Sequence, residues 1–176
     1  MIVLGIDPGT ATTGYGVVRG GNGSGPGTLL ECGVIRTRPR DPLPTRLQTI
    51  YDGLVELIAQ HRPDAVAVED VFYARNVRTT VVLGHARGVV LLAAAQAALT
   101  VHEFPPAEIK KAVTGRGAAS KEQVQFMVMR LLKLRRAPSP ADAADGVAAA
   151  LACLMRAHLD AVSTPSRTDT MLRTRT

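Results

Sequence analysis

Cysteine is scarce in this sequence, which has only Cys32 and Cys153 among its 176 residues. Neither belongs to a CxxC pair or stands near a histidine at zinc-ligand spacing, so the sequence indicates neither a disulfide framework nor a zinc site. Free thiols favour a reducing compartment, and we expect a cytoplasmic protein. The chain begins directly with a predicted strand, and no apolar run reaches membrane length, so we expect neither secretion nor membrane insertion.

Aromatic residues are also few: there is no tryptophan, and there are three tyrosines and three phenylalanines. Two of these six, Phe72 and Tyr73, are adjacent and stand shortly before Arg75 in a predicted loop. Aromatic side chains in such a loop could stack on an unpaired nucleobase, with Arg75 contacting DNA beside them. They could equally form a hydrophobic staple at the start of the next helix. The sequence leaves both interpretations open.

Acidic residues are outnumbered by basic ones, 15 to 21, which gives a net charge of +6 and a pI of about 9.9. The segment 105–136 alone has a charge of +6, because it contains eight basic residues and only two acidic ones, Glu108 and Glu122. A polyanion such as nucleic acid is the partner that this charge favours. The alternative is a solvated helix face that keeps the protein soluble. The basic residues are Lys110, Lys111, Arg116, Lys121, Arg130, Lys133, Arg135 and Arg136.

Hydrophobic periodicity predicts one α/β domain over residues 1–158, followed by a disordered basic tail at 159–176. The first three strands should form an antiparallel meander, with the fourth strand parallel to the first. Ser120 and Gln123 form a predicted capping box at the start of one helix. Strands are expected near residues 2–7, 14–19, 29–37, 64–69 and 100–104, and helices near 45–61, 77–99, 107–113, 120–134 and 140–158.

Four carboxylates occur where separate elements could bring them together. Asp7 and Glu69 each end a predicted strand, and Asp142 and Asp145 share one face of the last helix. Oxygen ligands of this kind suit two hard divalent cations, which can hydrolyse a phosphodiester. Each residue also has a simpler explanation: Asp7 could be a turn residue, and Asp142 could cap its helix.

The side chain of Glu69 is central to this hypothesis. Glu69 follows Val66 and Val68, and we place it on the face that those two residues form, where a buried carboxylate needs a cationic partner. Lys110, Lys111 and Lys121 could neutralise a scissile phosphate or the charge that develops on it, although most lysines are merely solvated.

Several motifs together resemble the RuvC family of bacterial Holliday-junction resolvases, in order from about residue 1 to 158. They are Asp7-Pro-Gly-Thr with Gly14-Tyr-Gly, Val68-Glu-Asp-Val-Phe, Ile109-Lys-Lys-Ala-Val-Thr-Gly, Ser120-Lys-Glu-Gln-Val-Gln and Ala141-Asp-Ala-Ala-Asp-Gly. The resemblance implies an RNase H-like fold with a five-stranded mixed sheet flanked by helices. It also implies a homodimer, dependence on Mg²⁺ or Mn²⁺, and work alongside the branch-migration proteins RuvA and RuvB.

The resemblance assigns roles to residues as well. Asp7 would bridge two metal ions, with Glu69, Asp142 and Asp145 completing the ligand set. Phe72 would insert at the centre of the junction, and Lys110 and Lys121 would contact phosphate.

The function expected from these features is symmetric nicking of two strands of a four-way DNA junction, leaving 5′-phosphate and 3′-hydroxyl ends. An actin-like kinase or ATPase also has an Asp-x-Gly-Thr motif, but it would need two such domains. A YqgF-like RNA-processing nuclease, or a non-catalytic junction binder of the same fold, is the remaining alternative. Gly84 and Gly88, four apart on the predicted helix 77–99, leave room for another helix, either of the same monomer or of a second subunit. The two-fold symmetry of a four-way junction favours the second subunit, and we expect a two-fold homodimer with this helix at or beside the interface.

Overall fold

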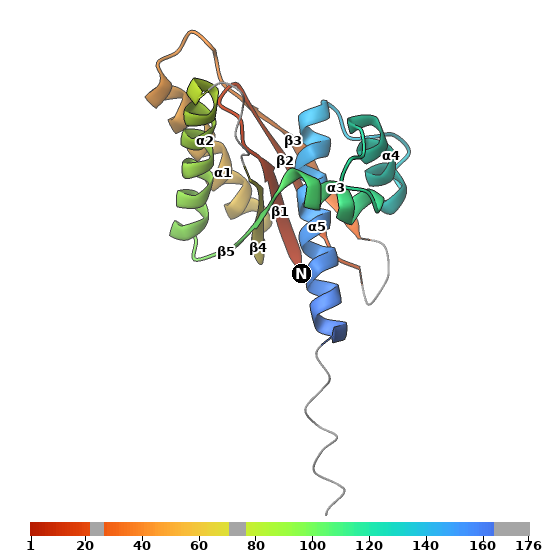
Figure 1. Ribbon diagram of the computed structural model, residues 1–176. Coiled ribbons are helices and arrows are strands. Elements are labelled where there is room, and N and C mark those ends of the chain that lie inside the picture. Colours follow the sequence, from red (N-terminus) through yellow and green to blue (C-terminus); the bar gives the residue numbers. More distant parts are fainter. Residues whose placement is uncertain (22–26, 71–76, 164–176) are drawn as a thin grey trace, which may run out of the picture.

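The computed structural model describes residues 1–21, 27–70 and 77–163. Five strands form one sheet in the order β3-β2-β1-β4-β5, flanked by helices on both faces (Figure 1). The strands are β1 (Ile2–Asp7), β2 (Thr12–Arg19), β3 (Thr28–Arg36), β4 (Ala65–Glu69) and β5 (Thr100–Phe104). The helices are α1 (Leu43–His61), α2 (Val77–Gln96), α3 (Pro106–Thr114), α4 (Lys121–Leu131) and α5 (Ala141–Ser163).

Strand β1 lies at the centre of the sheet and sets its directions. It pairs antiparallel with β2, so that Asp7 lies opposite Gly14, and parallel with β4, so that Ile6 lies opposite Val68. Because β4 also pairs parallel with β5, the carboxyl ends of β1, β4 and β5 meet at one edge of the sheet. The predicted five-stranded mixed sheet is therefore confirmed.

The two faces of the sheet have separate hydrophobic cores. Val3 and Val18 point toward α3, α4 and α5, whereas Leu4 and Ile6 point toward α1 and α2. This division follows from the strand backbone, in which successive side chains project to opposite faces. Figure 1 shows α1 and α2 on one side of the sheet and α5 with α3 and α4 on the other.

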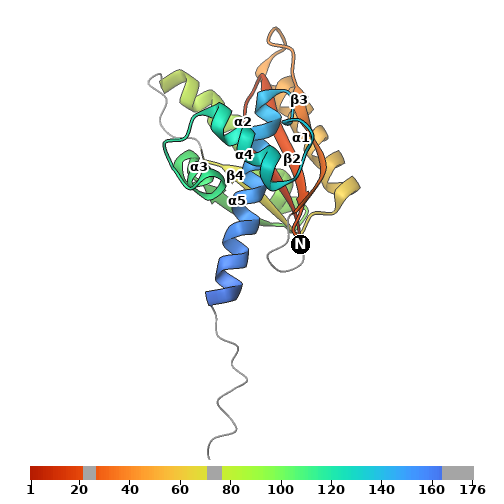
Figure 2. The same ribbon diagram turned by 90° about the vertical axis from the view of Figure 1, so that its right-hand side faces the viewer.

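Helix α5 lies very close to the sheet because glycines face each other across the contact. A Cβ atom on Gly5 would be only 2.1 Å from the carbonyl oxygen of Gly146, and one on Gly146 would be 2.6 Å from the Cα of Tyr15. The buried stretch of α5 around Gly146 consists largely of alanine, which keeps the approach close. Figure 2 shows α5 running along the sheet, with α3 and α4 beside it.

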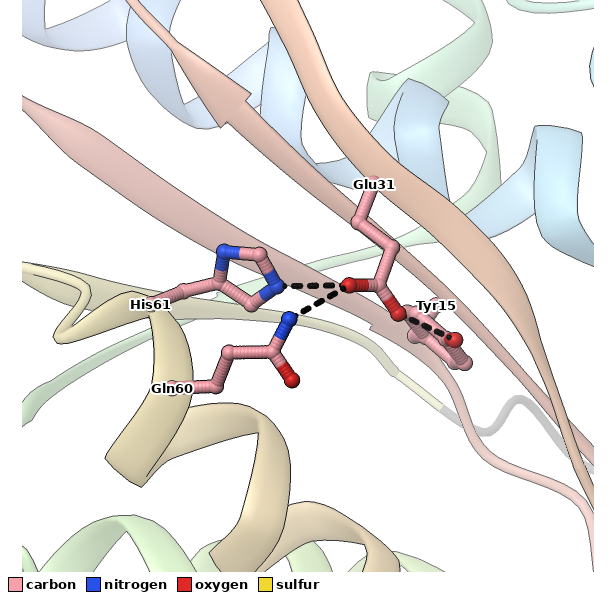
Figure 3. A network of polar contacts seen from close by, with 4 residues as sticks. All are labelled: Tyr15, Glu31, Gln60 and His61. Atoms are coloured by element: carbon pink, nitrogen blue, oxygen red, sulfur yellow. Dashed lines mark hydrogen bonds and ion pairs between the residues drawn. The ribbon is translucent and has the colours of Figure 1, made fainter.

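On the opposite face, a polar network joins α1 to β2 and β3 (Figure 3). The hydroxyl of Tyr15 donates to Oε1 of Glu31 at 2.8 Å, and Oε2 of Glu31 lies 2.8 Å from Nε2 of His61 and accepts from Nε2 of Gln60 at 3.1 Å. Hydrogen bonds from His61 and Tyr15 lower the pKa of Glu31. Burial and the Glu31 carboxylate raise the pKa of Tyr15 to about 12, so this side chain stays a donor at neutral pH.

Several predicted boundaries differ from the structure, among them those of α1, α4 and α5. Helix α1 begins at Leu43 rather than Thr45, because a proline is compatible with the first turn of a helix. Helix α4 ends at Leu131 rather than Leu134, because Lys133 takes a left-handed backbone conformation, with φ of 52°, that does not continue the helix. Helix α5 continues past His158 to Ser163, so a tail starting at residue 159 is wrong for its first residues. Residues 164–176 lie outside the described part of the chain.

The expectation that no segment has membrane length also needs correction. By length and composition alone, Thr79–Gln96 of α2 and the whole of α5 could cross a membrane. Core helices of soluble proteins pass the same test, and α5 is such a helix, since its buried residues pack against the sheet and against α3 and α4. Its alanine-rich composition serves close packing within the fold.

Candidate metal centre

Asp7 is the last residue of β1, and its side chain faces α5. It shares that face with Val3 and Gly5, as the period of two along a strand requires. A hydrogen bond within the following turn holds its backbone: the hydroxyl of the buried Thr13 donates to the carbonyl oxygen of Gly9 at 2.7 Å. The position of this carboxylate is therefore determined by the sheet and by a constrained turn.

Asp142 and Asp145 come from the first two turns of α5 and meet Asp7 at the sheet edge. One carboxylate oxygen from each of the three residues lies within 4.8 Å of the others, a spacing at which they could hold a metal ion. The close contact of α5 with the sheet makes this possible: a Cβ on Gly14, the residue opposite Asp7, would be 1.9 Å from the carbonyl oxygen of Asp142. The predicted convergence of these three aspartates is confirmed.

The expected orientation of Glu69 on the face of Val66 and Val68 is wrong. Those valines belong to the core under α1 and α2, whereas Ala67 belongs to the core under α5. Alternation along β4 puts Glu69 on the same side as Ala67, and therefore on the side of Asp7 and Asp145. Glu69 lines a pocket of about 220 Å³ together with these two aspartates. It is not part of the tighter group formed by Asp7, Asp142 and Asp145.

Burial and neighbouring carboxylates raise the proton affinity of Asp7 and Glu69 at this site. Burial, with the nearby charges of Glu69, Asp145 and Asp142, raises the pKa of Asp7 from 3.8 to about 7. Burial and Asp145 raise the pKa of Glu69 from 4.5 to about 7. Placing several anions in a partly buried pocket is unfavourable unless a cation or protons compensate them.

Two lysines contribute positive charge to the same pocket. Lys121 begins α4, where Ser120 and Gln123 form the predicted capping box, and its Nζ lies 3.1 Å from Oδ2 of Asp145. Lys110 on α3 also lines the pocket, and its charge lowers the pKa of Glu69. Lys111 is exposed and is not among the residues that line it. Of the three lysines considered from the sequence, the structure brings Lys110 and Lys121 to the carboxylates.

Part of the site was not foreseen from the sequence, and part cannot be placed. Pro106, Ile109, Val124 and Ala148 form an apolar wall of the pocket. Their hydrophobic positions on three helices gave no signal beyond that of ordinary core residues. Phe72, Tyr73 and Arg75 lie outside the described residues.

The donor set fits hard divalent cations. Among the described residues, the candidate ligand atoms gathered here are carboxylate oxygens, which hard divalent cations prefer. The ion pair with Lys121 offsets the charge of Asp145 and leaves most of the negative charge of the site uncompensated. The chemistry open to such a site is hydrolysis of a phosphate ester.

Comparison with known proteins places this site in a family. The sequence profile described as crossover junction endodeoxyribonuclease RuvC matches residues 3–153. RuvC of Pelotomaculum thermopropionicum is 50% identical over 152 residues, covering 86% of this chain and 91% of that protein. RuvC of Halorhodospira halophila is 52% identical over 149 residues, covering 85% of this chain and 87% of that one.

Solved structures agree with the sequence relatives. The structure of Thermus thermophilus RuvC has a TM-score of 0.84 at 38% identity, covering 91% of this chain and 97% of that one. RuvC of the same organism in complex with a Holliday junction substrate has a TM-score of 0.86 at 38% identity, with 91% and 96% covered. The yeast mitochondrial Holliday junction resolvase Ydc2, at 14% identity and a TM-score of 0.54, shares the fold. The acidic cluster lies at the edge of the sheet where the sequence motifs predicted it. On the family match and the sequence identity to its members, this chain belongs to the RuvC family of crossover junction endodeoxyribonucleases.

Proposed function

We propose that this protein resolves four-way DNA junctions by nicking two strands of like polarity at symmetric positions. The observation that carries the proposal is the convergence of Asp7, Asp142 and Asp145 within 4.8 Å, in a chain that belongs to a family of junction endonucleases. A complete acidic cluster argues against a non-catalytic junction binder. The excess of basic over acidic residues suits a nucleic-acid substrate.

Asp7, Glu69, Asp142 and Asp145 would hold the metal ions, Mg²⁺ or Mn²⁺. When bound, two such cations supply an activated water for in-line attack and stabilise the leaving 3′-oxygen. Burial and the charges of Glu69, Asp145 and Asp142 all raise the pKa of Asp7, so Asp7 interacts electrostatically with every other carboxylate of the site. Oxygen ligands alone do not distinguish Mg²⁺ from Mn²⁺.

Lys121 and Lys110 would hold the scissile phosphate against the carboxylates. Both line the pocket, and the side chain of Lys121 is 64% exposed, so its amino group can reach a bound strand without leaving the site. Their charge offsets the negative charge that develops on the phosphate during attack. Pro106 and Ile109 would form the apolar side of the site, next to the bound strand.

A homodimer would supply the second incision. A four-way junction has two-fold symmetry, and an isologous dimer presents two identical sites with matching symmetry. On α2, a Cβ on Gly84 or Gly88 would meet no atom of the described part of the chain within 4 Å, and Val81 and Leu92 are exposed apolar residues on the same helix. This surface is the part of α2 that we propose a second subunit covers. Cooperation with RuvA and RuvB in the cytoplasm belongs to the same proposal.

The test compares three labelled substrates with the purified protein: a four-way junction, a linear duplex of the same sequence and an RNA–DNA hybrid, each with Mg²⁺ or Mn²⁺. We expect paired nicks in the junction and little cleavage of the other two. Preferred cleavage of the RNA–DNA hybrid would favour the YqgF-like alternative. Junction binding without cleavage under either metal would show a non-catalytic binder.

A further inference from the structure

Arg87 joins α2 to the ends of two neighbouring strands. Its guanidinium pairs with the carboxylate of Glu103 on β5, and its Nε lies 3.5 Å from Oδ1 of Asp70, which directly follows β4. The Nε atom is buried and makes no hydrogen bond to any residue that the structure describes, and the Asp70 carboxylate is its charged neighbour. The Arg87 side chain is 27% exposed, and those of Asp70 and Glu103 are 41% and 44% exposed, so water partly screens both ion pairs.

Asp70 is the residue next to Glu69, and the two side chains point to opposite faces of the sheet. Glu69 faces α5 and the other carboxylates, whereas Asp70 faces α2 and Arg87. The backbone of Asp70 is also fixed, because its amide donates to the carbonyl oxygen of Phe104 at 2.8 Å. Arg87 and β5 therefore hold the chain immediately after the ligand Glu69.

Glu69 is the carboxylate whose placement depends most on such support. Asp7, Asp142 and Asp145 already lie within 4.8 Å of one another, while Glu69 stands outside that group at the last position of β4. The pairing of β4 with β1 ends with Val68 opposite Ile6, so Glu69 is paired on one side only, with Phe104 of β5. If Asp70 left the α2 face, the backbone of the last residues of β4 would change with it, and the Glu69 carboxylate would no longer be held toward the pocket.

We propose that Arg87 is a positioning residue for metal binding: by holding Asp70 on the α2 face, it keeps Glu69 directed into the pocket on the α5 face. Arg87 itself does not line the pocket, so it acts through Asp70. This inference rests on the proposed metal-dependent function. The alternative role is purely structural, with Arg87 attaching α2 to the sheet and having no effect on the ligand.

In the first experiment, Mn²⁺ is titrated into the DNA-free protein. Calorimetry measures the binding affinity, and paramagnetic broadening of nearby NMR resonances reports where the ion binds. Arg87→Gln and Asp70→Asn should each weaken Mn²⁺ binding about 10-fold, the usual effect of losing a group that orients a metal ligand. The double variant should be no weaker than either single variant, since both remove the same contact. Exchange of the Asp70 amide hydrogen should become faster in Arg87→Gln.

Arg156→Gln is the matched control. Arg156 also reaches β5 from a helix, with its guanidinium 3.3 Å from Nδ1 of His102 and 4.6 Å from the centre of the Phe104 ring, but it has no contact with Asp70. We expect this variant to bind Mn²⁺ like the wild type. Glu103→Gln, which leaves the Asp70 contact in place, should have a smaller effect than Asp70→Asn.

Unchanged Mn²⁺ affinity in folded Arg87→Gln and Asp70→Asn would overturn the proposal, as would equal losses in Arg156→Gln. If Arg87→Gln does not fold, Asp70→Asn alone decides, because its exposed carboxylate can be replaced without removing α2 from the sheet. Failure of the proposed function would look different: the wild type would bind Mn²⁺ and leave the junction intact.

Discussion

Lys121 neutralises Asp145 across two helices, with Nζ of the lysine 3.1 Å from Oδ2 of the aspartate. The aspartate raises the pKa of Lys121, chiefly through this hydrogen bond, so the amino group stays charged. Because Lys121 is the first residue of α4, its charge opposes the positive end of the helix dipole unless anions lie close by. The carboxylates of the site are such anions, and a bound phosphate would be another.

Lys121→Ala should therefore slow cleavage far more than it destabilises the fold. The lost contact is exposed at the lysine end, so we expect a stability change below about 1 kcal/mol and a single-turnover rate at least 10-fold lower at saturating enzyme. Arg130→Ala, at the exposed far end of the same helix, is the control and should leave the rate unchanged. An unaltered rate in Lys121→Ala would remove the lysine from the mechanism.

Replacing Asp7 or Glu69 should separate catalysis from binding. Asp7→Asn and Glu69→Gln keep the shape of each side chain but remove a charged oxygen ligand, so we expect loss of cleavage with junction affinity within a few-fold of wild type. Gel-shift titration and gel assays of strand cleavage measure the two properties. Wild-type turnover of either variant with Mg²⁺ would refute the assignment of the metal site.

Without metal, the protein should become less stable as pH rises through neutrality. The folded-state pKa of both Asp7 and Glu69 is raised to about 7, so between roughly pH 4 and 7 the folded state binds more protons than the unfolded one. The free energy of unfolding is therefore greatest below the unfolded-state pKa values. It should decrease by on the order of 2 kcal/mol by pH 8, after allowing for solvent screening. Urea unfolding in EDTA at pH 5 and pH 8 measures this difference.

The double variant Asp7→Asn with Glu69→Gln is the control for that pH profile, because it removes both groups. Its stability should vary less between pH 5 and pH 8, and it should exceed that of the wild type at pH 8. Mn²⁺ should raise the wild-type melting temperature more at pH 8 than at pH 5, since the ligands bind metal when deprotonated. Identical profiles for the two proteins would contradict the assigned charge cluster.

Gly146→Ala should damage the fold and the site together. The new methyl group would be 2.6 Å from the Cα of Tyr15, so α5 must move away from the sheet and carry Asp142 and Asp145 with it. We expect a loss of several kcal/mol, as for other overpacked cores, and reduced metal affinity in whatever remains folded. Gly84→Ala on the open face of α2 has space for its methyl group and should leave monomer folding intact. Thermal melts compare the two.

The proposed homodimer predicts paired incisions within one complex. Light scattering at micromolar concentration should give twice the monomer mass, and a supercoiled cruciform plasmid should pass directly to the linear form. A Leu92→Glu substitution on the exposed face of α2 should weaken assembly. A monomer that first releases open circles would contradict the dimer.

The sequence by itself determined the sheet and most of the metal site. Alternation and turn residues predicted each strand, and Asp7, Asp142 and Asp145 could be identified because they stand at the ends of elements whose order brings them to one edge. The capping box of Ser120 and Gln123 is equally local, since its two hydrogen bonds span only three residues. Features that depend on neighbouring residues along the chain can be predicted from it.

The tertiary structure decided what depends on packing between distant segments. Glu69 lies on the α5 face of the sheet because Ala67, two residues earlier on the same strand, packs in the core under α5. The contact of Arg87 with Asp70 forms only when α2 lies across the ends of β4 and β5. The closeness of α5 to the sheet needs Gly5 and Gly146 to meet, although they are far apart in the sequence. Such contacts leave no periodic signal in the sequence, because only the folded chain brings their residues together.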